Sequence, residues 1–94
     1  MKRLRSAHPG KLLLDEFIKP MNLTVYRVAK DAGIPQSTLA SVVSGHRSIS
    51  AETGVRLGLY FGVDAQFWLN LQTHYDLEQE QERLAKRLER EVKC

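Results

Sequence analysis

The apolar residues of the chain recur at helical spacing. They return every three or four positions, and nowhere do β-branched and aromatic residues alternate strictly with polar ones, as they would in a half-buried strand. Residues that end helices interrupt the pattern at four places, which are Pro20, Gly33, Gly45 and Gly62. The pattern therefore predicts an all-α chain with five helices.

The first helix should begin at Pro9 and Gly10 and form about three turns, because Pro20 prevents its continuation. We expect His8 to order the start of this helix. The apolar residues of the segment, spaced for one helical face, are Leu13, Leu14, Phe17 and Ile18.

Two short helices should follow on either side of Gly33. Thr24 is a suitable N-cap for the second helix, because its hydroxyl can accept a hydrogen bond from an amide of the first turn. Gly33 should end that helix in the left-handed conformation. Pro35 suits the first position of the third helix, which should run to about Ser44 and end at Gly45.

The fourth helix should be capped by Ser50 and end at Gly62, with Val55 and Leu59 facing inward one turn apart. Asp64 should cap the fifth helix. That helix contains the densest aromatic cluster of the chain, which we expect to anchor the core. Its members are Phe67, Trp68, Leu71 and Tyr75.

The composition changes after residue 77, so we predict a domain over residues 1–77 and a charged tail over residues 78–94. The apolar residues of the tail share one helical stripe: Leu84, Leu88 and Val92. The stripe could pack on a partner helix. Alternatively, the tail could be a solvated, partly disordered helical extension, which is more typical of a short tail with so few apolar residues.

The segment from Val25 to Ser44 has the pattern of a helix-turn-helix. Ala29 is small enough to let the next helix cross closely, and Gly33 allows a sharp turn four residues later. Five apolar residues should fill the angle between the two helices: Val28, Ala32, Ile34, Leu39 and Val42. The pattern favours DNA binding over a plain helical bundle with a solvated polar face.

The opposite face of the third helix carries small or hydrogen-bonding side chains. They are Gln36, Ser37, Ala40, Ser41 and Ser44. Glutamine can bind adenine through two hydrogen bonds, serine hydroxyls can bind base edges or phosphates, and an alanine methyl can contact thymine. Thr24 and the amides that start the second helix suit phosphate contacts, with Arg27 supplying positive charge nearby.

Size and charge limit the function further. A chain of 94 residues buries only roughly 60 to 65% of the surface of its unfolded form, so it has one core and lacks the cleft of a large enzyme. Residues 1–62 hold nine bases and four acids, whereas residues 63–94 hold five bases and seven acids. The formal charge of +3 is therefore distributed as +5 and −2. The two parts should face different partners, and the basic part suits a polyanion.

The sequence lacks the patterns of catalytic, cofactor and metal sites. Its histidines, His8, His46 and His74, are far apart, and the single Cys94 allows neither an internal disulfide nor a cysteine-based zinc site. It has no Gly-x-Ser-x-Gly turn and no glycine-rich phosphate loop. We expect a non-enzymatic protein without cofactor or metal. Without a long apolar run or a signal peptide pattern, it should be cytoplasmic and independent of membranes.

Three blocks of the sequence resemble the HigA-type antitoxins, a branch of the Xre/Cro-like helix-turn-helix repressors. The blocks are HPGKLLLDEFIKPMNLT, VAKDAGIPQSTLASVVSGHRSIS and FGVDAQFWLNLQTHYDL, and the match extends from His8 to about Leu77. The third block is the most specific to this branch. The resemblance implies a five-helix, lambda-repressor-like domain that dimerises, represses its own operon through a palindromic operator, and neutralises a small basic HigB-type toxin that cleaves messenger RNA.

The resemblance also implies which residues bind DNA. The base-facing residues would be Gln36, Ser37 and Ser41. Thr38 would lie near the helix start. The residues toward the DNA backbone would be Thr24, Arg27, Ser44 and Arg47. Many relatives carry Arg or Lys on the exposed face of the third helix, which this chain lacks. Its affinity should therefore depend more on phosphate contacts, for which Arg3 and Arg5 are further candidates.

Two other functions stay open. The chain could be an orphan Xre-type repressor without a toxin, or an interaction module that sequesters a toxin and binds DNA little. The acidic excess after Gly62 would attract a basic toxin in the second case. A small basic protein encoded just upstream would favour the antitoxin over both alternatives.

Overall fold

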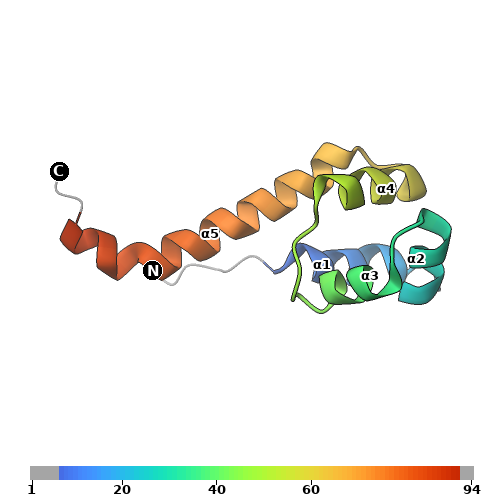
Figure 1. Cartoon of the computed structure of the whole chain (residues 1–94), viewed down its shortest axis with the longest axis horizontal. Helices are drawn as coiled ribbons and strands as arrows, with labels where there is room; N and C mark the ends of the chain where they lie inside the picture. The colour runs from blue at the N-terminus through green and yellow to red at the C-terminus, as the bar shows by residue number, and fades with distance from the viewer. Residues whose placement is uncertain (1–6, 92–94) are drawn as a thin grey trace.

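The computed structural model describes residues 7–91, except for the side chains at positions 86 and 88–90. Every regular element in this range is helical. The elements are α1 (Pro9–Leu12), η1 (Leu13–Ile18), α2 (Val25–Ala32), α3 (Gln36–Val43), α4 (Ala51–Phe61) and α5 (Ala65–Glu91). Because η1 continues α1 without interruption, the described chain has the five predicted helices, and the all-α fold is confirmed (Figure 1).

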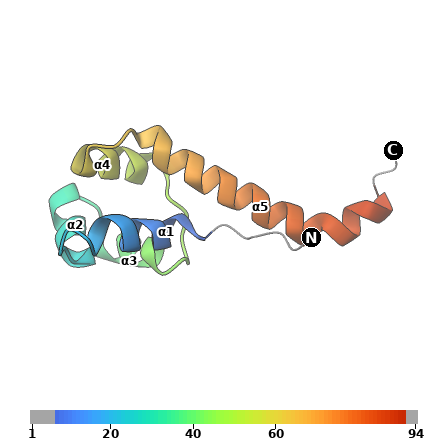
Figure 2. The ribbon, with the colours of Figure 1, turned by 180° about the vertical axis from the view of Figure 1, so that it is seen from behind.

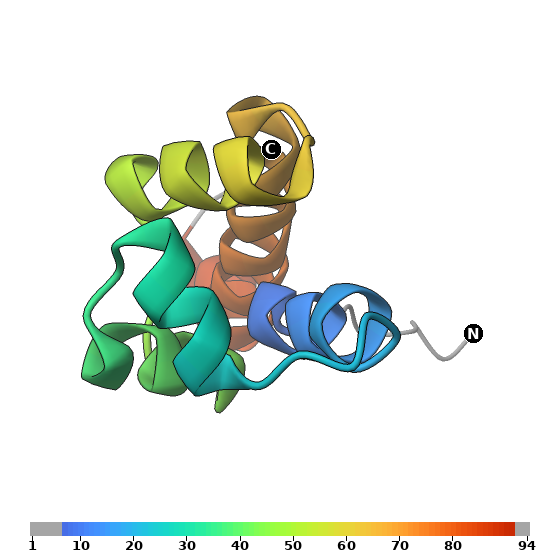
Figure 3. The ribbon, with the colours of Figure 1, turned by 90° about the vertical axis from the view of Figure 1, so that its right-hand side faces the viewer.

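The shorter helices form a globular head, from which α5 extends as a long arm (Figure 2). Within the head, α2 packs on α3 and α4, α1 packs on α3, and α5 packs on α4 and α1. An end-on view shows α1, α2 and α3 on one side, with α4 and the start of α5 above them (Figure 3). The arm makes the molecule 50 Å long and only 25 Å wide.

The core forms around Trp68, which is fully buried on α5. Its ring lies 4.9 Å from that of Phe17 and 6.4 Å from that of Phe61, measured between centroids. The prediction that the aromatic cluster anchors the core is therefore confirmed for Trp68. It is wrong for Phe67, which contacts Trp68 at 5.1 Å but keeps 38% of its surface exposed at the edge of the cluster.

The His-Pro-Gly motif attaches α1 to the end of α3. The His8 ring accepts a hydrogen bond at Nδ1 from the Gly10 amide at 2.9 Å, so His8 is the N-cap, as predicted. Pro9 is buried at the first helical position. A Cβ on Gly10 would lie 1.8 Å from the Val42 carbonyl oxygen, so only glycine allows the backbones of α1 and α3 to approach this closely.

The second half of the first helix differs from the prediction, because Leu13–Ile18 form a π-helix. The Lys19 amide donates to the Leu14 carbonyl oxygen, five residues back, at 2.9 Å. In an α-helix, residues five positions apart point about 140° away from each other around the axis. Hydrogen bonding between residues five apart widens the turn and brings them to nearly the same side of the helix. The wider turn therefore directs both Leu13 and Ile18 into the core.

Most predicted helix ends are confirmed. Thr24 accepts from the Arg27 amide at 3.1 Å, and Ser50 accepts from the Thr53 amide at 3.2 Å. Gly33 and Gly62 both end their helices at φ 72°. Asp64 accepts from the Gln66 amide at 2.8 Å, and Gly45 follows α3 at φ 83°. Pro35 is the N-cap of α3, one position before the predicted site.

The predicted inward face of α4 is wrong. Val55 and Leu59 are 49% and 82% exposed, whereas Gly54, Leu57 and Gly58 face inward. The reason is close packing, because a Cβ on Gly58 would lie 2.4 Å from the Val63 carbonyl oxygen. The same Cβ would lie 3.1 Å from the amide nitrogen of Ala65, so the glycine face brings the backbone of α4 close to the start of α5. Val55 and Leu59 lie on the outer surface of α4.

Helix α5 runs without a break across the predicted boundary between residues 77 and 78. Leu84 is half-buried, while the Leu88 side chain and Val92 lie outside what the structure describes. The division into a domain and a tail is therefore a change of composition within one helix, and its functional meaning stays a prediction.

Candidate nucleic-acid interface

Helices α2 and α3 form the predicted helix-turn-helix. Gly33 takes the left-handed conformation between them, and the Ile34 amide donates to the Ala29 carbonyl oxygen at 2.9 Å. The residues that fix the angle between the helices are buried: Val28, Ala29, Ile34, Leu39 and Val42. Packing therefore leaves one face of α3 directed away from the head.

The outward face of α3 is polar and carries no charge. Its exposed residues are Gln36, Ser37, Ala40 and Ser44, and Thr38 and Ser41 are half-buried beside them. These short side chains make a surface that an edge of a base pair can approach closely. In Figure 1, α3 lies along the lower edge of the head, with the start of α2 at one end and the loop after α3 at the other.

The loop after α3 folds back onto the helix. The Ser41 carbonyl oxygen accepts from the His46 amide at 2.9 Å and from the Ser44 hydroxyl at 3.1 Å. The Arg47 guanidinium donates to the Thr38 hydroxyl at 3.3 Å, which holds a positive charge beside the exposed face. Arg47, Thr38, Ser41 and Ser44 therefore form one continuous surface.

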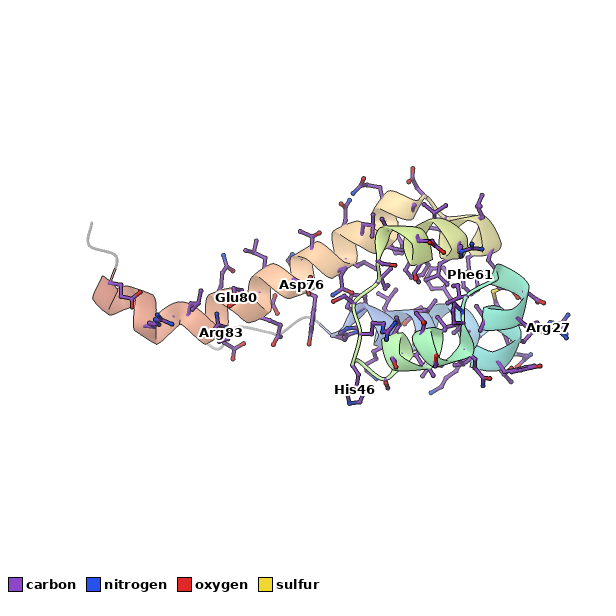
Figure 4. All side chains as sticks on the ribbon, viewed as in Figure 1. Arg27, His46, Phe61, Asp76, Glu80 and Arg83 are labelled. Atoms are coloured by element: carbon purple, nitrogen blue, oxygen red, sulfur yellow. The ribbon has the colours of Figure 1, made fainter. Side chains whose placement is uncertain are left out.

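His46 belongs to this surface, although the sequence did not single it out as a binding residue. Its Nδ1 lies 2.8 Å from the Ser44 hydroxyl, and its ring projects from the lower edge of the head (Figure 4). The signal in the sequence was its place between Gly45 and Arg47, directly after the third helix.

The start of α2 supplies a second set of groups. Thr24 accepts from the Arg27 amide, and a hydroxyl that accepts in this way keeps an O–H that can donate to a phosphate oxygen. Arg27 lies at the far end of the head (Figure 4). Its Nε donates to the Asp31 carboxylate at 2.8 Å, and the Tyr60 hydroxyl donates to the same carboxylate at 3.2 Å.

This network shifts the pKa of all three side chains, Arg27, Asp31 and Tyr60. The hydrogen bond from Arg27 lowers the pKa of Asp31, and the bond from Tyr60 adds to the effect. The bond to Asp31 raises the pKa of Arg27, while burial and Asp31 together raise the pKa of Tyr60. Arg27 is thus fixed by α2 and α4, and its side chain stays 66% exposed.

The loop that leaves the interface is held by a buried glutamine that the sequence did not single out. Gln72 on α5 accepts from the Ile49 amide at 2.9 Å and donates to the Asp76 carboxylate at 2.8 Å. It is only 5% exposed. In the sequence, Gln72 follows Trp68 by one helical turn on the same apolar stripe, and this position could have indicated that its side chain is buried.

The predicted DNA-binding residues fall into two groups. Six lie together on α3 and its loop: Gln36, Ser37, Thr38, Ser41, Ser44 and Arg47. Thr24 and Arg27 lie on α2, and Arg3 and Arg5 lie outside the described residues. Each residue's role in binding DNA stays a prediction. Among the described residues, we find no cluster of three metal-ligating side chains and no helix apolar and long enough to span a bilayer.

Comparison with known proteins identifies the family. Residues 14–68 match the helix-turn-helix family model. Virulence-associated protein I of Dichelobacter nodosus is 47% identical over 70 residues, which cover 74% of this chain and 65% of that protein. The chain thus spans just under two thirds of that relative. Antitoxin HigA-1 of Vibrio cholerae is 30% identical over 73 residues, covering 78% of this chain and 69% of the relative.

Solved structures agree with this assignment. The Pseudomonas aeruginosa antitoxin HigA, solved with the higBA promoter, superposes with a TM-score of 0.90 at 36% identity. The superposition covers 95% of this chain and 97% of that one. Family match, sequence identity and fold coincide over the region that contains the α2–α3 unit. The chain therefore belongs to the Xre-like helix-turn-helix family of non-enzymatic regulators, and its fold is that of the HigA antitoxins.

Proposed function

We propose that the chain is the antitoxin and autorepressor of a type II toxin–antitoxin pair. As a homodimer in the cytoplasm, it binds a palindromic operator in its own promoter, with α3 of each copy in successive major grooves about 34 Å apart. It also neutralises a small basic HigB-like toxin that cleaves messenger RNA. The observation that carries this proposal is the uncharged, exposed face of α3, bordered by Arg47.

In this function, Gln36, Ser37 and Ser41 contact base edges. The residues that contact the DNA backbone are Thr24, Arg27, Ser44 and Arg47, and Thr38 lies near the start of α3, where its hydroxyl accepts from Arg47. The promoter bound by the P. aeruginosa antitoxin supports DNA as the partner, since that protein resembles this chain over nearly its whole length.

Toxin binding rests on the antitoxin relatives and on charge. The part of the chain after Gly62 has two more acids than bases, which suits a basic partner. Because this part is distinct from the exposed face of α3, one copy can engage DNA and a toxin through different surfaces.

Two measurements test the proposal. A reporter driven by the chain's own promoter should be repressed when the chain is supplied, and unaltered reporter output would contradict autorepression. The small basic protein encoded beside the chain should arrest growth alone and be harmless when both are expressed. Arrest that persists despite soluble chain would reject the antitoxin role and leave the repressor role intact.

A further inference from the structure

His46 is an exposed histidine within the candidate interface, and the proposed function gives it no role. It lies in the loop that leaves α3, between Ser44 and Arg47, which contact the DNA backbone in the proposed function. Its ring projects from the edge of the head along which α3 lies (Figures 1 and 4). A titratable group therefore lies where the DNA backbone would pass.

The hydrogen bonds of Ser44 determine which ring nitrogen of a neutral His46 carries the proton. The Ser44 hydroxyl has a single hydrogen, and it donates this hydrogen to the Ser41 carbonyl oxygen at 3.1 Å. The Ser44 oxygen also lies 2.8 Å from Nδ1 of His46. Because Ser44 has no second hydrogen to give, Nδ1 donates in this bond. Nε2 of the neutral ring is therefore an acceptor.

A neutral His46 ring consequently cannot donate a hydrogen bond to DNA through its outer nitrogen. Nε2 lies farther from the backbone than Nδ1, on an exposed side chain, so it is the nitrogen that a phosphate would meet. The lone pair of Nε2 repels a phosphate oxygen, which itself can only accept. Protonation turns Nε2 into an N–H donor and makes the ring positive, while the bond from Nδ1 to Ser44 is kept.

We propose that His46 binds a DNA phosphate only in its protonated form, so that promoter binding takes up a proton. This role depends on the proposed function, since it requires DNA along the exposed face of α3. A hydrogen bond from a cationic ring to a phosphate is charge-assisted, and the phosphate in turn favours the cation. DNA affinity should therefore increase as the pH falls through the range in which histidine ordinarily changes its charge.

The charged groups around His46 act in both directions. Four other residues that carry titratable or charged side chains line a hollow of about 140 Å³ beside it, which are His8, Arg47, Tyr75 and Asp76. The Asp76 carboxylate of α5 and the negative end of the α3 dipole favour a positive ring, whereas Arg47 opposes it. Burial lowers the pKa of His8, which keeps that ring neutral to lower pH. A bound phosphate adds a further negative charge, so protonation should be stronger in the complex than in the free chain.

The test is the affinity of the full chain for a labelled fragment of its own promoter, measured by fluorescence anisotropy at pH 6, 7 and 8. The wild type should bind at least about threefold more tightly at pH 6 than at pH 8, because uptake of one proton changes log affinity by up to about one per pH unit. The salt dependence should also be steeper at pH 6, by up to about one in the slope of log affinity against log salt.

Two substitutions at His46 separate its charge from its size. His46→Gln has a neutral side chain, so its affinity should be nearly independent of pH and close to that of the wild type at pH 8. His46→Arg is positive throughout and should bind at pH 8 about as tightly as the wild type binds at pH 6. A wild-type pH response in His46→Gln would overturn the assignment of the proton to His46.

The other two histidines supply matched controls. His74 is exposed on α5, where its Nε2 lies 3.7 Å from the Glu78 carboxylate, outside the candidate interface. His74→Gln should keep the wild-type pH response, and so should His8→Asn, which retains a capping oxygen. A response that disappears in either control and persists in His46→Gln would identify a different titrating group and overturn the inference.

Unrelated DNA of the same length distinguishes a phosphate from a base edge. Phosphate contacts carry no sequence information, so this DNA should show the same pH response at its lower affinity. A response confined to the promoter would place the ring on a base edge and overturn the phosphate contact.

Nitrogen NMR tests the position of the proton without DNA. In the free chain at pH 8.5, the imidazole spectrum should show the proton of the neutral His46 ring on Nδ1. Ser44→Ala removes the acceptor of this proton and should reduce the preference for Nδ1. A wild-type ring that carries its proton on Nε2 could donate to phosphate without taking up a proton, and would overturn the inference.

Failure here is distinguishable from failure of the proposed function. Promoter binding that is intact but independent of pH would overturn the role of His46 alone. Absence of promoter binding at every pH would reject the repressor function, and the role of His46 with it.

Discussion

At the residue scale, Gly10 is a point of close contact between the backbones of α1 and the end of α3. A side chain there would clash with the Val42 carbonyl oxygen, which belongs to backbone and cannot rotate away. Gly10→Ala should therefore lower the free energy of unfolding by roughly 1–3 kcal/mol, the usual cost of overpacking. Urea denaturation checks this against Lys11→Ala, which alters an exposed neighbour. Equal stability of both variants would show that α1 can shift without cost.

His8 should make folding sensitive to pH. Burial lowers its pKa, and the negative charge of Asp76 only partly opposes this shift. The unfolded chain therefore binds the proton more strongly, so the contribution of His8 is complete above about pH 6.5. It is lost as the pH falls through the lower folded pKa, when protonated Nδ1 can no longer accept from the Gly10 amide.

The check is the urea midpoint measured between pH 7.5 and pH 5. The wild type should lose stability on acidification, and His8→Asn, which keeps a capping oxygen without a titrating ring, should lose less. The same pH dependence in both proteins would remove His8 as the cause.

At the element scale, Gln72 connects α5 to the loop between α3 and α4. Gln72→Leu would leave the Ile49 amide buried without its acceptor, at a cost of about 1–3 kcal/mol. Hydrogen exchange at Ile49 should accelerate more than exchange in α2. Gln66→Leu is the matched control, because the Gln66 side chain is exposed and its amide group donates along the same helix to Asn70. Similar exchange in both variants would count against the connection.

Helix existence, most caps and the helix-turn-helix followed from the sequence, because each depends on neighbours in the chain. Thr24, Ser50 and Gly33 act locally, so residue type was sufficient. The inward face of α4 could not be predicted in this way. Gly54 and Gly58 face inward because they lack side chains and so let α5 approach, and a pattern of hydrophobic residues carries no information on such close packing. The π-turn at Leu13–Ile18 likewise serves tertiary packing.

The candidate site, like the fold, could be predicted where it depends on local sequence and not where it depends on contacts between distant residues. The face of α3 followed from its helical period, but the fold-back of Arg47 onto Thr38 joins residues nine apart and depends on the loop. The link from Arg27 through Asp31 to Tyr60 crosses between α2 and α4, so no local pattern contains it.

At the scale of the whole molecule, the basic excess of residues 1–62 should make DNA affinity strongly dependent on salt. Each phosphate contact releases counterions, so the affinity should fall steeply between 50 and 200 mM salt. Arg47→Ala should reduce the slope of log affinity against log salt by about one. Titration of a labelled promoter fragment by fluorescence anisotropy gives both slopes. A flat salt response would exclude phosphate-driven binding.

Footprinting on the chain's own promoter tests most directly whether α3 reads the operator. The wild type should protect a two-fold symmetric site. Gln36→Ala combined with Ser41→Ala should weaken that protection at least about tenfold, because a bidentate glutamine contact contributes about 1–3 kcal/mol. Binding to unrelated DNA should stay unchanged. An intact footprint in the double variant would contradict the assignment of α3 as the reading helix.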